Sequence, residues 1–466
     1  MHFPQAGSMV SVRDLAALNQ ELRKATEAGY QTPAGLGSGS MSALVPQSLE
    51  GTLATKTFTM AEIALWPSIP KVSVSQTVHE FSRIQEHGYE LDGWISEGGA
   101  GVVDVAQYTR DSVKVRYLST QREVTDVATL VGVIGPSANA LAEETERGTI
   151  HLLGRLEHHL FHSRNDMNSD AFDGLFKQIE DGASGNVTDM RGKSIEPNKL
   201  QEILGEQYSA PNYGQSDCIY AEPRVLTDLI RQTVVYGRHD QLAVSAGSGM
   251  TFGVRNLTMM APYGPVPVKA APFLHTSKAA AATGYGSGKP LNPVIASSAS
   301  AGSGSQFAAA DVGDYIWQIV AVGDQGYSAP IATSAVTTVA GEEVSITITD
   351  NGIATSGAAS VKYYRVYRSD KDGAVGTCRH AFDFVRNPAA DTVIKDTNAD
   401  LPGTSKMLMI KHDQSILEFV RLLDFLRRPL AETKTSKPFL LMLFGSPLVK
   451  VPSKCWMLKN VGVESA

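Results

Sequence analysis

The pattern of apolar and polar positions predicts one dominant helix in the first half of the chain. Apolar side chains recur every three or four residues over 138–161, which is the period of an amphipathic helix. Residues 135–137 read Gly-Pro-Ser, a chain stop followed by an N-cap candidate. Acidic residues gather near the start of this segment and His158, His159 and His162 lie at its end, which suits the helix dipole. At about 36 Å, such a helix is long enough to back a sheet or form a spine.

Two segments upstream of this helix alternate as strands do. Residues 71–78 and 113–118 place apolar side chains at every second position, so each predicts a strand with one apolar face. The glycine-rich segment 93–101 between them cannot pack a core by itself. We therefore expect a long two-stranded excursion. An isolated hairpin is only marginally stable in water, so this excursion needs a neighbour to lie on.

The start of the chain predicts an arm instead of a core. Within residues 1–50, one short helical segment at 12–22 is followed by a Gly/Ser-rich run at 35–40. This composition is typical of an extended, flexible segment.

Residues 173–273 have the pattern of an α/β region. An apolar series at helical spacing begins after Pro223, and residues 252–257 continue as a strand. The proline-rich segment 262–268 predicts a turn that leads into an edge strand, because proline cannot donate to a sheet.

The composition changes near residue 274 and predicts a separate β-rich module. An Ala/Gly/Ser-rich linker spans 279–288. Short strands with turn signals follow, and their spacing predicts a β-sandwich of about 100 residues. Residues 290–405 hold seven basic and twelve acidic residues, so they carry −5 of the net charge of −7. An acidic, solvated module suits an outward-facing surface. The expected strands are 315–322, 343–349, 362–368 and 392–395.

The main-body pattern resumes after residue 405. Residues 416–425 have helical spacing and predict an amphipathic helix that ends near Pro429. Residues 438–444 are apolar throughout, as in a fully buried strand, and 448–451 and 456–463 close the chain as strands. A β-rich segment between two α/β parts is the pattern of a domain inserted into a surface loop.

Composition narrows the class of protein. The chain has 466 residues, 42% hydrophobic and 19% charged, as expected for a soluble globular protein of several domains. It contains no apolar run of about 20 residues and does not start with a secretory signal, so we expect synthesis in a cytoplasm and no membrane. The mildly acidic charge argues against a protein whose main task is neutralising nucleic-acid phosphates. Cys218, Cys378 and Cys455 are widely spaced and predict free thiols.

The sequence contains only weak candidates for catalytic or ligand-binding residues. Residues 286–290, Gly-Ser-Gly-Lys-Pro, lack the first glycine and the final Ser or Thr of a phosphate-binding loop. His158 and His162 share a helix face, but His159 stands where the zincin motif requires Glu. Asp173 and Glu180 could form a glycosidase pair, although the separation of two carboxylates cannot be read from sequence.

None of these candidates is strong enough to assign a functional site. The triplet at 186–188, Asn-Val-Thr, is a chance match to a glycosylation acceptor when no secretory signal precedes it. No group of residues meets even the outline of a catalytic constellation. We therefore assign no catalytic, cofactor-binding or metal-binding residue, expect no cofactor, and expect that the protein is not an enzyme.

The order of these parts resembles the major capsid protein of tailed bacteriophages, the Hong Kong 97-type fold. Residues 95–120 are similar to the extended loop of that family, and 127–162 to the approach to the spine helix and the helix itself. Residues 220–226 and the helix after them resemble the axial domain, and the stretch 425–463 resembles the closing peripheral segment. Residues 315–330 and 363–369 are similar to immunoglobulin-like or fibronectin-type modules.

The resemblance implies an α+β capsid fold with an all-β sandwich insertion. The expected parts are an N-terminal arm (1–50), peripheral strands (51–92), the extended loop (93–126), the spine-helix region (127–172), the axial domain (173–273), the linker and immunoglobulin-like insertion (274–406) and the return to the main body (407–466).

The resemblance also implies a function through assembly. Identical copies would form the hexamers and pentamers of an icosahedral shell around double-stranded DNA, with the arm and extended loop lying over neighbouring subunits. Scaffold, portal and decoration proteins are implied as partners, DNA by proximity only, and the virion as the location. Some family members link a loop lysine to a neighbour's asparagine, and Lys114 is available for this link.

Two other readings stay open at the level of sequence. The chain could be another phage structural protein or an encapsulin-like compartment protein, which would form rings, tubes or other shells. It could also be a carbohydrate-active enzyme with a β-sandwich module, which would require activity on glycans that depends on single carboxylates.

Overall fold

The computed structural model describes residues 56–88, 94–101, 103–131, 139–236, 257–302, 304–349, 360–388, 390–432 and 434–463. The expected helix at 12–22 and almost all of the expected strand at 252–257 lie outside these ranges. In these ranges helices and strands are mixed, so the α+β class expected from the sequence is confirmed. Within them no helix combines the length and the apolar character needed to cross a bilayer.

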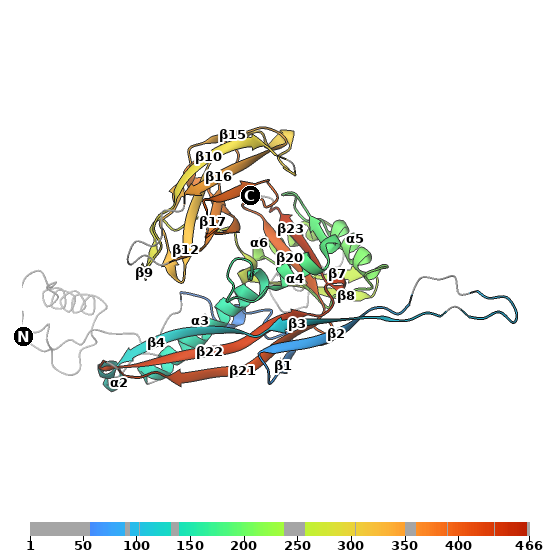
Figure 1. The fold of residues 1–466 in the computed structure, drawn as a ribbon, viewed down its shortest axis with the longest axis horizontal. Coiled ribbons are helices and arrows are strands. Elements are labelled where there is room, and N and C mark those ends of the chain that lie inside the picture. The colour runs from blue at the N-terminus through green and yellow to red at the C-terminus, as the bar shows by residue number, and fades with distance from the viewer. Residues whose placement is uncertain are drawn as a thin grey trace, which may run out of the picture. The chain divides into compact units, whose positions relative to one another are not determined.

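A four-stranded sheet and one long helix pack against each other as two layers (Figure 1). The helix α3 packs on strands β4 and β22 of this sheet and buries Leu152 against Phe439 and Leu441. The predicted helix is therefore confirmed, although its N-cap is Asn139, whose side chain accepts the Leu141 N–H, and not Ser137. The bounds are α3 Ala140–His162, and in sheet order β1 Lys71–Ser73, β21 Leu417–Pro429, β22 Ser436–Val449 and β4 Arg116–Thr125.

The predicted helix at 416–425 is wrong, because this segment is strand β21. It pairs with β22 along most of its length and with β1 at its start. Phe419 is fully buried and its ring meets the ring of Trp66 edge-on, with centroids 4.8 Å apart. The helical spacing of the apolar residues was outweighed by partners that lie on both sides of the segment.

A six-stranded sheet forms a second layer with its own core. The helix after Pro223 is confirmed as α6. The predicted edge strand at 262–268 is instead the interior strand β8, which pairs with β7 on one side and β6 on the other. Pro265 and Pro267 have no backbone N–H to donate. No hydrogen bond to β6 is lost through them, because β6 pairs only with residues 268–270. The bounds are, in sheet order, β5 Val187–Asp189, β23 Trp456–Val461, β20 Ser405–Ile410, β6 Cys218–Ala221, β8 Gly264–Ala270 and β7 Thr258–Ala261, with helices α4 Leu175–Gly182, α5 Pro197–Tyr208 and α6 Pro223–Tyr236.

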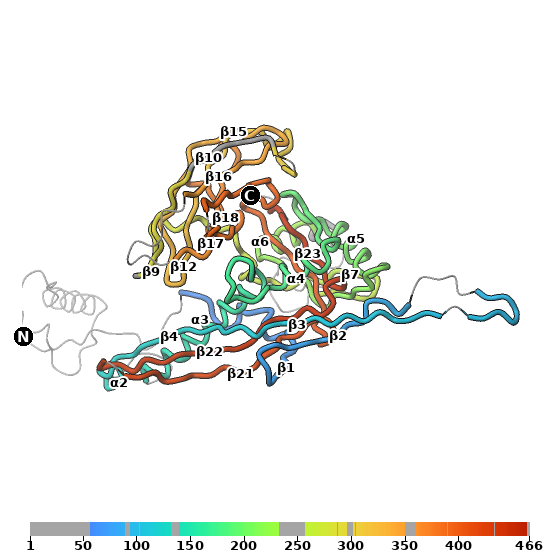
Figure 2. Tube along the Cα trace, in the orientation of Figure 1, coloured from blue at the N-terminus to red at the C-terminus, as the bar shows by residue number. Residues whose placement is uncertain are grey.

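Strands β9 to β19 form two larger sheets that share one core, and they follow one another in the chain (Figure 2). Trp317 and Ile319 of β12 pack in the same cluster as Val344 and Ile346 of β16. The sheet orders are β10-β16-β19 and β18-β17-β12-β13-β9, with β14 paired to β12 and β11 to β15. The bounds are β9 Tyr285–Gly288, β10 Val294–Ala301, β11 Gly313–Tyr315, β12 Trp317–Gly323, β13 Gln325–Tyr327, β14 Ile331–Ala332, β15 Val336–Thr338, β16 Glu342–Thr349, β17 Val361–Arg368, β18 Arg379–Val385 and β19 Thr392–Asp396.

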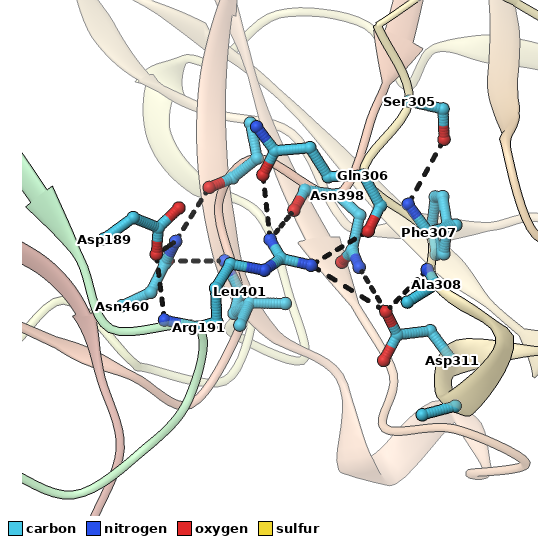
Figure 3. A network of polar contacts seen from close by, with 12 residues as sticks. Asp189, Arg191, Ser305, Gln306, Phe307, Ala308, Asp311, Asn398, Leu401 and Asn460 are labelled. Carbon is cyan, nitrogen blue, oxygen red and sulfur yellow. Dashed lines mark hydrogen bonds and ion pairs between the residues drawn. The ribbon is translucent and has the colours of Figure 1, made fainter.

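Arg191, which follows β5, ties this β-rich region to the six-stranded sheet (Figure 3). Its guanidinium donates to the side-chain and backbone oxygens of Gln306, both at 2.9 Å, and to the backbone oxygen of Asn398 at 2.6 Å. Asn460 of β23 donates to the backbone oxygen of Ala399 at 2.8 Å and accepts the Leu401 N–H at 2.9 Å. One of the two segments that these residues hold lies between β10 and β11, and the other directly follows β19.

Candidate interaction surface

A two-stranded hairpin projects from the four-stranded sheet (Figure 1). Its strands are β2 Val78–Glu86 and β3 Gln107–Lys114, which pair with each other in antiparallel register. Neither strand contains a fully buried residue. The excursion expected from the sequence is therefore present, and it begins earlier than the glycine-rich segment that indicated it.

The base of the hairpin is anchored to the body. Phe81 and Val113 pack against a small buried cluster that includes Val420 and Leu448. Arg83 forms an ion pair of 2.8 Å with Asp111 across the strands and donates to the backbone oxygen of Lys450 at 3.4 Å. These contacts orient the hairpin where it leaves the sheet.

Large apolar side chains are exposed further along the hairpin. Ile84 and Tyr108 lie directly opposite each other in the register and are 52% and 68% exposed. Trp94 and Val103, beyond the paired strands, are 89% and 87% exposed. Burying side chains of this size stabilises a complex by about 1.5–3 kcal/mol each. Exposed apolar clusters of this kind mark interaction surfaces.

A second exposed apolar group lies beside the end of β4. The short helix α2 Asp126–Leu130 is capped by the Thr125 side chain, which accepts the Ala128 N–H. Val127, Leu130 and Val131 are all exposed, Leu130 to 85%. This helix presents apolar side chains outward and forms a second candidate contact surface.

The histidines at the end of α3 line a cavity of about 320 Å³. The rings of His158 and His162 lie with centroids 5.0 Å apart, so these two residues do share a face, as expected. Burial, reinforced by the neighbouring His159 ring and the positive charge of Lys278, lowers the pKa of His158 to about 3. In the part of the chain that the structure describes, no group of three or more His, Cys, Asp or Glu side chains is arranged to hold a metal ion.

The other candidate residues from the sequence analysis either belong to the fold or are exposed. The Asp173 carboxylate accepts the Asn165 N–H at 2.8 Å and so closes a turn, while Glu180 is exposed. Residues 286–288 belong to strand β9, which pairs with β13 and is not a loop that opens a helix. Lys114 is exposed at the base of the hairpin, where it pairs with Val78.

Asn186 and the three cysteines are all buried. Asn186 is buried and donates to the backbone oxygens of Ser453 and Cys455, at 2.6 and 3.0 Å, so its side chain is already engaged. The three cysteines are free and buried, and burial raises the pKa of Cys455 to about 12.

No protein-family model matches the chain. A curated relative, a protein assigned by inference as the major capsid protein of Enterococcus phage phiEF24C, is 22% identical over 96% of both chains. Among solved structures, an encapsulin of Synechococcus elongatus matches 92% of this chain and 98% of its own, with 11% identity and a TM-score of 0.46. The capsid of a native GTA particle matches with 10% identity and a TM-score of 0.46, covering 92% of this chain and 99% of that one. The capsid of Myoviridae phage XM1 matches with 7% identity and a TM-score of 0.42, over 92% of this chain and 99% of its own.

Proposed function

We propose that this chain is the major capsid protein of a tailed bacteriophage and that its copies assemble into the closed shell of the virion. The full-length relative of Enterococcus phage phiEF24C supports the same assignment that the order of parts in the sequence suggested. The single structural observation that carries the proposal is the β2–β3 hairpin, which exposes Ile84, Trp94 and Tyr108.

The hairpin needs a covering surface, and a second copy of the chain is the partner that fits. A two-stranded sheet with no buried side chain is marginal on its own. Its anchored base holds it away from its own core, so its apolar residues are available to a neighbour. Every copy presents the same hairpin, and repeated heterologous contacts of this kind close into rings when the rotation between copies allows it.

The β9–β19 region would be an immunoglobulin-like insertion, within limits of 274–406, on the outer face of the shell. Its acidic charge supports this placement, because like charges on neighbouring copies resist self-association. The role of the chain would be structural and not enzymatic. Scaffold, portal and decoration proteins would be its further partners, with DNA nearby but not read by sequence, and synthesis would take place in the host cytoplasm.

Electron microscopy of the purified full chain, with size-exclusion chromatography, tests the proposal. The wild type is expected to form capsomers or shells, and the double variant Ile84→Ser, Trp94→Ser to remain largely unassembled while melting at the same temperature. Tyr285→Ser, which removes an exposed aromatic residue of β9, is the matched control and should assemble normally.

Two outcomes would overturn the proposal. One is a wild type that stays monomeric under all assembly conditions, and the other is a hairpin variant that assembles like the wild type. An encapsulin-like compartment would also form closed shells, so the nucleic-acid content of particles from infected cells separates that alternative from a phage capsid.

A further inference from the structure

The cavity beside the end of α3 has more cationic than anionic side chains in its lining. It is lined by the last turn of α3 and the loop after it, the segment around residues 275–278, strands β17 and β18, and the start of β20. Its cationic side chains are Arg164, Lys278, Arg365 and Lys406, and its carboxylates are Asp383 and Asp400. Five histidines also line it: His158, His159, His162, His275 and His380.

Part of this charge is balanced inside the protein. The Asp383 carboxylate interacts with Arg365 Nε at 3.3 Å and with His380 Nε2 at 3.0 Å. Arg164 pairs with Asp166 at 3.1 Å, a residue just outside the cavity. These contacts leave Lys278 and Lys406 as the cations whose charge is not compensated.

Neither lysine has an acidic partner among the residues that the structure describes. No ion pair within that part of the chain joins Lys278 or Lys406 to a carboxylate, and Lys406 lies over the ring of Phe176 at 5.6 Å. The positive charge of Lys278 helps to lower the pKa of His158, and that of Lys406 helps to lower the pKa of His162. The two lysines therefore face the same group of rings from different elements.

His162 adds an unsatisfied polar atom to the cavity wall. Its Nε2 atom is buried and has no hydrogen-bond partner in the described ranges. A buried polar atom of this kind usually has a hydrogen-bond partner, and a ligand bound in the cavity would supply one.

We propose that this cavity binds a phosphate-class oxyanion, held by Lys278 and Lys406 and contacted by the His162 ring. Lysine binds phosphate as a compact point charge, and hydrogen bonds from charged donors to an oxyanion are stronger than neutral ones. A volume of about 320 Å³ holds an inorganic phosphate or the phosphate end of a larger molecule. The last turn of α3 would by itself favour a cation, so anion binding depends on the two lysines.

Isothermal titration calorimetry of the full chain with inorganic phosphate tests the proposal. Saturable binding is expected. Lys278→Gln and Lys406→Gln should each weaken binding about tenfold, which corresponds to one lost charged contact. Lys434→Gln removes an exposed lysine of the β21–β22 turn and should leave binding unchanged.

Thermal melting of each variant without phosphate establishes that it is folded. Competition between phosphate and a short oligonucleotide separates free phosphate from the backbone phosphates of nucleic acid as the source. The proposal is overturned if the wild type binds no phosphate, or if both folded lysine variants bind it as tightly as the wild type.

Discussion

The Oε1 atom of Glu157 accepts a hydrogen bond from the backbone N–H of Leu65 at 2.6 Å, and both residues are fully buried. The same carboxylate accepts the N–H of Ala64 at 3.0 Å and of Trp66 at 2.9 Å. One side chain of α3 thus satisfies three consecutive backbone donors from a segment more than 90 residues earlier in the chain. Burial raises the pKa of Glu157 despite these three donors.

Glu157→Ala should strongly destabilise the folded subunit, because it leaves three donors without an acceptor in or near the core. We expect a loss of about 2–4 kcal/mol in the free energy of unfolding, since each unsatisfied buried group costs about 1–3 kcal/mol and some of the loss is recovered by relaxation. Denaturant unfolding of unassembled subunits measures it. Glu146→Ala, an exposed change on the same helix, should cost less than 0.5 kcal/mol; similar losses for both variants would show that the contact is unimportant.

The ion pair between Arg368 and Asp396 is a second buried polar feature. The Asp396 carboxylate accepts a hydrogen bond from the Arg368 guanidinium at 2.9 Å and another from the indole N–H of Trp317 at 2.8 Å. Asp396→Ala would leave the arginine buried without its partner, and such changes cost about 3–5 kcal/mol. Limited proteolysis should then cut within β9–β19 much faster than in the wild type or in Lys371→Ala. Equal cleavage rates would contradict this expectation.

Arg191 is expected to hold the β9–β19 region to the rest of the chain. Arg191→Ala removes the bonds to Gln306 and Asn398, and should lower the free energy of unfolding of the joined structure by about 1–2 kcal/mol. Arg191→Lys keeps the charge but loses the forked geometry, so it should behave closer to alanine than to arginine. Melting temperature and cleavage near residues 398–404 measure both effects; a lysine variant identical to the wild type would show that charge alone suffices.

Stability of the unassembled subunit should fall in mildly acidic solution. Burial lowers the pKa of His158 to about 3 and that of His159 to about 4, whereas both titrate near 6.5 in the unfolded chain. The unfolded state therefore binds more protons between pH 6.5 and pH 4, so the stability present above pH 6.5 is progressively lost over that window.

Melting temperatures between pH 8 and pH 5, in phosphate-free buffer, test this pH dependence. His158→Gln should flatten the curve, because glutamine does not titrate, while His87→Gln, at an exposed position, should leave its slope unchanged. Parallel curves for the wild type and His158→Gln would assign the pH dependence to other groups.

The sequence by itself determined the elements whose formation depends on neighbours in the chain. The period of α3, the short alternating strands of β9–β19 and the glycine-rich excursion are all local patterns, and the structure contains each of them. Local backbone preference and the side on which apolar residues fall were sufficient for these elements.

Only the tertiary structure decided the elements and sites that depend on distant partners. Residues 416–425 have helical spacing but almost all of them lie in strand β21, because β1 and β22 supply backbone partners and Trp66 packs on Phe419. The cavity could not be foreseen either, since its walls bring His162 together with Lys278 and Lys406 from separate elements. Pairing partners and converging charges are set by the folded arrangement of distant segments, and a linear pattern carries no information about which of those segments will meet.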